Sequence, residues 1–263
     1  KPQTADGYRP DVTENCERML VTLLRKLGPW KDSLFLVGGL APRYLVPERP
    51  DIPPHAGTMD VDVVVELKVL ADTQAYQTLE ANLKDMGFSR ATNEEGIKLS
   101  WRWRVETETG ATVILEFLAD DPAATGGKVR PLPSKGRLSA LNIPHAAMVF
   151  DHHETKDVTA KLLGGDGIVT ETVRHADVVT LVCLKAFAFD DRAARKDAHD
   201  LVYCLQHADG GIEGAAEAFR DAHQGRHAHV IDKALEILKS RFVDDDRTEG
   251  YSKDGPIAAA RFD

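Results

Sequence analysis

The first half of the chain alternates between helix-like and strand-like patterns of apolar residues. From Asp11 to Leu27 the apolar residues recur with helical spacing, which predicts an amphipathic helix. The short apolar run from Leu34 to Val37 is typical of a buried strand, and Leu40 to Val46 predicts one or two helical turns. A valine-rich strand from Met59 to Leu67 and a helix from Lys68 to Met86 are expected next.

Strands dominate the next part of the chain. Ile97 to Val105 alternates apolar and polar residues, which predicts a half-buried strand, and Thr112 to Leu118 predicts its neighbour. The stretch from Ala119 to Gly136 is rich in proline and glycine, which predicts a long loop or a boundary between sub-elements. Thr159 to Leu163 and Ile168 to Val173 predict a β-hairpin. This order of elements predicts a mixed α/β (α+β) fold with a small sheet.

The pattern becomes helical after Asp177. Four helices are expected there, at Val178 to Phe189, Arg192 to His207, Gly214 to Ala222 and His229 to Phe242. We therefore expect an α/β domain at 1–176, a helical domain at 177–246 and a flexible tail at 247–263.

Composition and charge restrict the possible functions of the chain. The chain has 263 residues, 43% of them hydrophobic and 29% charged, which is ordinary for a globular protein. Its net charge of -9 makes nucleic acid an unusual default partner, because phosphate-based binding needs basic surfaces. No apolar run approaches the roughly 20 residues that span a bilayer. Cys16, Cys183 and Cys204 form no CxxC pair, which favours buried reduced thiols in a cytoplasmic protein.

Two aspartates offer the first candidate chemistry. Asp60 and Asp62 are two residues apart on a predicted strand, so both side chains point to the same face. Two carboxylates this close repel each other unless a cation neutralises them, and Mg²⁺ takes hard oxygen ligands. The pair therefore indicates a metal-triphosphate site, with a solvated strand face as the alternative.

Gly38 and Gly39 follow the first predicted strand. Glycine lets the backbone approach a ligand closely, and the free N–H groups at the start of the next helical segment attract anions. A phosphate site is one interpretation of this pair, and an ordinary turn is the other.

Glu116 stands among apolar residues in the stretch TVILEFLAD. An acid at such a position is costly to bury unless it is paired or bound to a metal. Glu116 is therefore a third candidate acid for the metal site. The alternative is an ion pair with Arg102 or Arg104.

In combination, these features resemble the core motif of the nucleotidyltransferase superfamily, whose members have the DNA-polymerase-β-like fold. The resemblance implies that Gly38 and Gly39 hold the triphosphate of an NTP. It also implies that Asp60, Asp62 and Glu116 are the catalytic acids and bind Mg²⁺, with Mn²⁺ as an alternative. The family more often has Asp where this chain has Glu116, and the segment between Gly39 and Asp60 is longer than in its smallest members.

A second string, KAFAFDDRAARKDAHDLVYCL, resembles a segment of the abortive-infection (AbiE-type) nucleotidyltransferase toxins and of the related MenT-type toxins. The resemblance implies that Lys185 reaches the nucleotide phosphates. It gives Arg192, Asp197 and Asp200 a role in lining the nucleotide site or in locking the domain. The helical domain at 177–246 is then expected to complete the nucleotide cleft of a catalytic domain at 1–176. An ordinary salt-bridged helix surface is the alternative.

The resemblance implies an enzyme that moves an NMP from an NTP to an acceptor hydroxyl and releases pyrophosphate. AbiE-type relatives suggest RNA as the acceptor, in particular the 3′ end of tRNA, and a toxin–antitoxin pair with a cognate antitoxin as partner. One alternative is an antibiotic nucleotidyltransferase with an aminoglycoside-type acceptor, which a net charge of -9 favours by steering cations. The other is a catalytically silent nucleotide-binding module of the same fold.

Overall fold

The computed structural model describes residues 2–66, 68, 72–131, 138–243, 245, 247 and 249–263 of the chain. The chain forms two compact units. The sheet unit comprises Pro10–Leu40 and Thr58–His175, and the helical unit comprises Lys1–Arg9, Ala41–Gly57 and Ala176–Asp263. The division at Ala176 lies where the sequence pattern changes. The observed units differ from the expected domains in one respect. Lys1–Arg9 and Ala41–Gly57 belong with the C-terminal helices, whereas the sequence pattern places them with the sheet.

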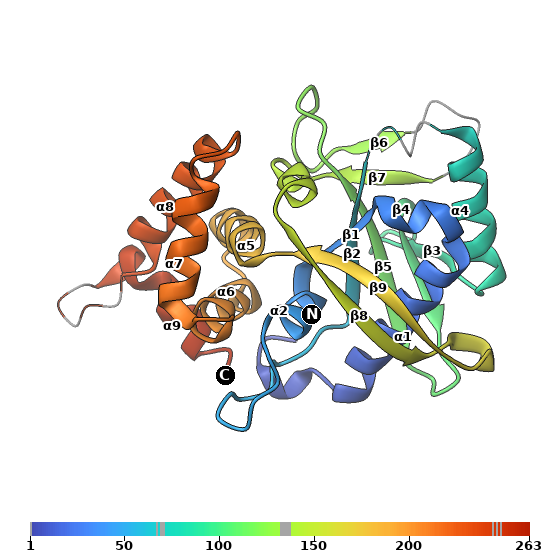
Figure 1. The fold of residues 1–263 in the computed structure, drawn as a ribbon, viewed down its shortest axis with the longest axis horizontal. Coiled ribbons are helices and arrows are strands. Elements are labelled where there is room, and N and C mark those ends of the chain that lie inside the picture. Colours follow the sequence, from blue (N-terminus) through green and yellow to red (C-terminus); the bar gives the residue numbers. More distant parts are fainter. Residues whose placement is uncertain are drawn as a thin grey trace. The chain divides into compact units, whose positions relative to one another are not determined.

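The sheet unit is built on a mixed sheet with nine strands among the described residues (Figure 1). The main strand order is β3-β4-β5-β2-β1-β9-β8, and β7 pairs with both β5 and β6. The strands are β1 Leu34–Val37, β2 Asp60–Val65, β3 Ser89–Thr92, β4 Lys98–Glu106, β5 Thr112–Ala119, β6 Val129–Pro131, β7 Ser139–Asn142, β8 His153–Lys161 and β9 Ile168–Ala176.

The centre of the sheet is formed by β1, β2 and β5. Strand β2 is antiparallel to β1 and parallel to β5. All four residues of β1 are buried, and so are Val61, Val63, Val64 and Val65 of β2. Strands covered on both faces carry continuous apolar runs rather than alternating ones, which explains the valine-rich sequence of β2. Asp60 and Asp62 on β2 and Glu116 on β5 are acidic residues within these otherwise largely apolar strands.

Two α-helices belong to the sheet unit in the part of the chain that the structure describes. Helix α1 (Pro10–Leu27) is amphipathic as predicted, and its buried face includes Cys16, Met19 and Leu23. Helix α4 spans Thr73–Asp85, whereas the prediction began it at Lys68. Position 67 and positions 69–71 of these predicted elements lie outside the described residues.

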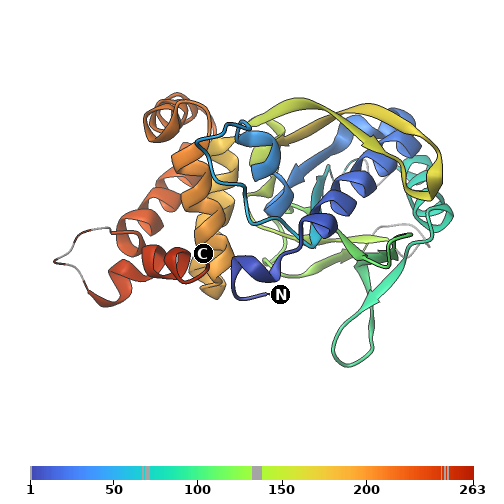
Figure 2. The same ribbon diagram turned by 90° about the horizontal axis from the view of Figure 1, so that it is seen from below.

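The helical unit contains α2 (Pro42–Leu45) and the C-terminal helices, which form a bundle (Figure 2). The C-terminal helices are α5 Val178–Arg192, α6 Arg195–His207, α7 Gly211–Ala222, α8 Ala228–Arg241 and α9 Asp254–Ala260. Asp177 begins α5 as an N-cap, because its carboxylate accepts the backbone N–H of Thr180 at 2.8 Å. Phe189, Ala198 and Ala259 form a buried core cluster of this unit. The four predicted C-terminal helices are thus present, with ends shifted by up to three residues.

Two sequence expectations about loops are wrong. The expected tail at 247–263 contains the helix α9, and Phe262 beyond it is fully buried. Of the two interpretations of Ala119 to Gly136, the long loop is wrong, because the described part of the stretch contains β6. In the described part of the chain no helix is long and apolar enough to span a membrane.

Candidate functional site

The sheet register brings Asp60, Asp62 and Glu116 together. In the parallel pair of β2 and β5, Asp62 lies directly opposite Glu116, and Asp60 lies opposite Ile114. Residues two apart on a strand share a face, so the three carboxylates lie on one face of two adjacent strands. One ligand oxygen from each acid lies within 4.8 Å of the others. The three acids predicted from the sequence therefore form one cluster.

The cluster is only partly accessible to water. Asp60 is buried, with 5% of its surface exposed, whereas Asp62 and Glu116 are half-buried. Glu116 also pairs with Arg102, which lies opposite it on β4, and Arg102 Nε is 3.0 Å from Glu116 Oε1. The ion pair that is the alternative explanation of Glu116 is thus present. It coexists with the approach of Glu116 to the two aspartates.

The donor set of this cluster fits a hard divalent cation. Carboxylate oxygens that share one Mg²⁺ lie up to about 4.2 Å apart, because each bond is about 2.1 Å long. The three ligand oxygens lie within 4.8 Å of one another, which is close to that spacing. Three like charges on one face repel each other, and a cation between them removes that repulsion. The arrangement is therefore suited to Mg²⁺ or Mn²⁺.

Gly38 lies against this cluster. It follows β1 with φ +70°, and its neighbour Val37 pairs with Asp62 in the sheet. A Cβ atom at Gly38 would lie 2.0 Å from Asp62 Oδ2, so no larger residue fits. Gly39 is buried in the same short 3-10 turn, Gly38–Leu40. The one or two helical turns expected from Leu40 to Val46 are a single turn, Pro42–Leu45. A helix this short contributes little dipole, so an anion here would be met mainly by the backbone of the two glycines.

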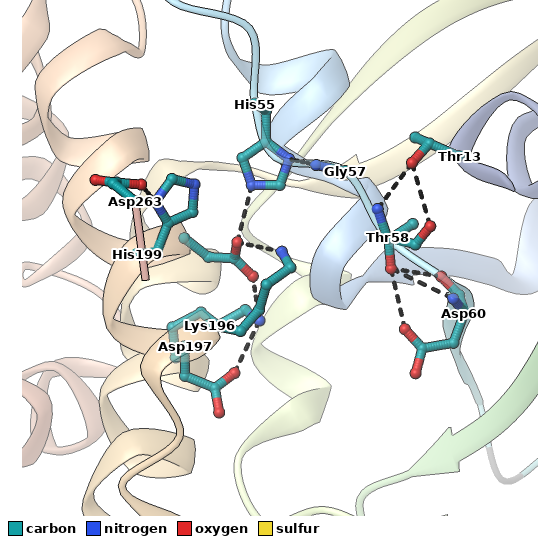
Figure 3. A network of polar contacts seen from close by, with 11 residues as sticks. Thr13, His55, Gly57, Thr58, Asp60, Lys196, Asp197, His199 and Asp263 are labelled. Carbon is teal, nitrogen blue, oxygen red and sulfur yellow. Dashed lines mark hydrogen bonds and ion pairs between the residues drawn. The ribbon is translucent and has the colours of Figure 1, made fainter. Parts of the chain in front are cut away.

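Two threonines that the sequence analysis did not single out support Asp60. Thr58 Oγ1 donates to Asp60 Oδ1 at 3.0 Å (Figure 3). Thr13 on α1 accepts the backbone N–H of Thr58 at 2.9 Å and donates to its carbonyl oxygen at 3.1 Å.

Burial raises the pKa of the nearby Cys16 thiol, and the charges of Asp60 and Asp62 raise it further. Cys16 is therefore a neutral thiol, not a nucleophile.

The second candidate group lies in the helical unit, around Lys185. Lys185 is 7% exposed, and its Nζ lies 2.9 Å from Asp197 Oδ1 and 2.6 Å from Asp200 Oδ2. Arg192 Nε lies 2.6 Å from Asp197 Oδ2, and Lys196 Nζ pairs with Asp200. These contacts tie α5 to α6. The role of Arg192, Asp197 and Asp200 in lining a nucleotide site or in locking the domain stays a prediction.

The charges of this network are fixed by their neighbours. Burial lowers the pKa of Lys185, but the charges of Asp200 and Asp197 outweigh it and raise the pKa above its ordinary value. Burial likewise raises the pKa of Asp200, yet Lys185, Lys196 and His55 hold it well below its usual range. A contact between Lys185 and a nucleotide phosphate would require Nζ to leave two buried carboxylates, which is costly. The nucleotide role of Lys185 and Arg192 stays a prediction.

His55, His199 and Asp200 form a second cluster with ligand atoms within 4.8 Å of one another. His55 Nδ1 accepts the backbone N–H of Gly57 at 3.2 Å (Figure 3). Nε2 therefore carries the proton and donates to Asp200 at 2.8 Å. A metal at Nε2 would displace this proton, and Asp200 already binds two ammonium groups. The cluster therefore serves as a hydrogen-bonded anchor for the segment Ala41–Gly57, not as a metal site.

Comparison with known proteins gives no family for this chain. No protein-family model matches it, and no curated protein matches it.

Proposed function

We propose that this protein is a Mg²⁺-dependent nucleotidyltransferase that moves an NMP from an NTP to an acceptor hydroxyl. The observation that carries the proposal is the approach of Asp60, Asp62 and Glu116 to within 4.8 Å beside the Gly38 turn. Phosphoryl transfer relies on positioning and charge neutralisation more than on covalent chemistry by the protein. A compact set of carboxylates next to a backbone turn without side chains supports that kind of catalysis.

Each residue of the cluster has its own role in the proposed reaction. Asp60 and Asp62 hold the metal, and the backbone at Gly38 and Gly39 meets the triphosphate. When bound, Mg²⁺ neutralises phosphate charge and orients the NTP. The acceptor oxygen forms a bond to the α-phosphorus, the bond from the α-phosphorus to the leaving pyrophosphate breaks, and the hydroxyl proton is released. Glu116 either joins the aspartates in holding the metal or takes this proton as the general base.

The acceptor is proposed as RNA, in particular the tRNA 3′ end, in a toxin–antitoxin setting. This choice rests on the resemblance to AbiE-type and MenT-type toxins. One observation favours a second candidate, an aminoglycoside-type acceptor. The net charge of -9 attracts a cationic small molecule and repels a polyanion.

The test is incubation of the purified protein with each α-³²P-labelled NTP and Mg²⁺, with either total RNA or a panel of aminoglycosides. Label on RNA supports the first acceptor, and label on a drug supports the second. Asp60→Asn should lower transfer by about two orders of magnitude or more, since it removes the negative charge of one metal-binding carboxylate. Asp157→Asn, an exposed acid on β8, is the matched control and should retain activity. Transfer by Asp60→Asn at the wild-type rate, or no transfer to either acceptor, would overturn the proposal.

A further inference from the structure

We propose that Thr58 is a positioning residue that orients the Asp60 carboxylate for metal binding, and that Thr13 holds Thr58 in place. The inference rests on the proposed function, because it takes Asp60, Asp62 and Glu116 as the metal ligands. It adds a supporting chain of hydrogen bonds that runs from the buried face of α1 to the Asp60 carboxylate.

The first link is the Thr58 hydroxyl. Its oxygen accepts the backbone N–H of Asp60 at 3.3 Å, so its single proton is available to the oxygens of Asp60. Those oxygens are Oδ1 of the side chain at 3.0 Å and the carbonyl oxygen at 3.1 Å. Thr58 is 1% exposed and Asp60 is 5% exposed, so bulk water competes poorly for these bonds. The hydroxyl therefore restrains how the carboxylate can turn (Figure 3).

The second link is Thr13 of α1. Its hydroxyl accepts from the N–H of Thr58 and donates to the carbonyl of the same residue, at 2.9 and 3.1 Å. This pair of bonds fixes the backbone of Thr58 two residues before Asp60, where the chain enters β2. Because Thr13 is itself buried at 6% exposure, the support comes from a packed helix rather than a loop.

A hydrogen-bonded partner behind a ligand sets the ligand's direction, and removing such a partner lowers metal affinity. Thr58→Val keeps the shape and the β-branch but deletes the hydroxyl, so Asp60 loses its restraint while remaining charged. Thr58→Ser keeps the hydroxyl and serves as the rescue variant. Thr22→Val is the matched control. Like Thr58, Thr22 is a buried threonine whose hydroxyl both donates and accepts a hydrogen bond, but it lies on α1. Its hydroxyl donates to the carbonyl oxygen of Arg18 at 2.7 Å and accepts the backbone N–H of Leu163 at 2.9 Å.

The experiment measures Mn²⁺ affinity by calorimetry and by electron paramagnetic resonance, with the melting temperature of each metal-free variant recorded in parallel. Thr58→Val should weaken Mn²⁺ binding about tenfold or more. Thr58→Ser should bind like the wild type. Thr22→Val should lower the melting temperature without changing the affinity. In the Asp60→Asn background, Thr58→Val should cause no further loss of affinity, because Thr58 acts through Asp60.

Two failures are distinguishable. Wild-type protein that binds Mn²⁺ normally, together with Thr58→Val of equal affinity, overturns the positioning role and leaves the proposed function standing. Wild-type protein that binds no Mn²⁺, with or without NTP, overturns the proposed function and this inference with it. Equal loss of affinity in Thr22→Val and Thr58→Val also overturns the inference, because general destabilisation then explains both.

Discussion

A Cβ atom on Gly38 would lie 2.0 Å from Oδ2 of Asp62, because the left-handed turn after β1 runs against that carboxylate. Glycine is required here for two separate reasons. One is the φ of +70°, which other residues adopt at a cost of about 1–2 kcal/mol. The other is space, which decides whether Asp62 can keep its position beside Glu116.

These two reasons can be separated by a pair of variants. Gly38→Ala should be destabilised and should lose Mn²⁺ binding, because the new methyl group displaces the Asp62 carboxylate. Gly87→Ala has a similar φ of +80°, but its Cβ would lie 4.0 Å from Val105 Cγ2, which is an ordinary contact distance. It should therefore cost about 1–2 kcal/mol and retain Mn²⁺ binding. Urea unfolding and Mn²⁺ calorimetry measure the two effects. Unchanged Mn²⁺ affinity in Gly38→Ala would contradict this account of the turn.

The three acids of this site can be identified from the sequence. The spacing of Asp60 and Asp62 requires a shared strand face, and an acid among apolar residues marks Glu116 as unusual. Their mutual approach was not accessible in the same way, because it depends on the parallel pairing of β2 with β5. Thr13 was missed because its hydroxyl bonds the backbone of Thr58, 45 positions away in the sequence. Thr58 was missed because its bond to Asp60 depends on the local backbone conformation, which the residue pattern does not give.

In the helical unit, the sequence pattern likewise predicts the elements but not the contacts between their side chains. Helical periodicity predicted α5 to α8 within a few residues, since each buries one face against its neighbours. The same pattern says nothing about which charges meet. Lys185, Asp197 and Asp200 are compatible with a surface, a nucleotide site or a buried network, and the structure places Lys185 Nζ between the two carboxylates.

The Lys185 network predicts a large stability effect. Lys185→Met keeps most of the side-chain volume but removes the buried ammonium that Asp197 and Asp200 share, so that they keep Arg192 and Lys196 as counter-charges. Breaking a buried ion pair in this way costs about 3–5 kcal/mol in unfolding free energy. Lys84→Met is the control, because Lys84 is 63% exposed and its pair with Glu80 should contribute less than about 1 kcal/mol.

Chemical unfolding and NTP titration of both variants separate the two roles of Lys185. A locking role gives a large loss of stability. A Lys185→Met protein with wild-type stability but much weaker NTP binding would favour the phosphate contact implied by the family resemblance.

His55 predicts how stability depends on pH. Burial lowers its pKa to about 4 despite the opposing hydrogen bond to Asp200, with Lys196 and His199 also facing it. Between pH 4 and the ordinary value of 6.5, the unfolded chain binds a proton that the folded chain does not. Stability should therefore rise with pH through this window and fall as the pH drops. The His55 contribution lost from pH 7 to pH 5 is about 2 kcal/mol.

Urea unfolding of the wild type and of His55→Gln at pH 7 and pH 5 measures this contribution. The variant should be less stable at pH 7, because it loses the bond to Asp200, but its stability should change less between the two pH values. Parallel pH profiles for the two proteins would show that His55 is not the group responsible.

The last prediction concerns Phe262, in the segment that the sequence pattern failed to identify as ordered. Phe262 is fully buried, and its ring centroid lies 5.8 Å from that of Tyr8 and 4.8 Å from that of His199. Phe262→Ala should therefore lower the unfolding free energy by about 3–5 kcal/mol. Ile257→Ala, on α9 with 39% of the residue exposed, should cost less than about 1 kcal/mol. Equal stability of the two variants would mean that the segment is not packed in solution, whereas a large difference would establish α9 and Phe262 as part of the helical unit's core.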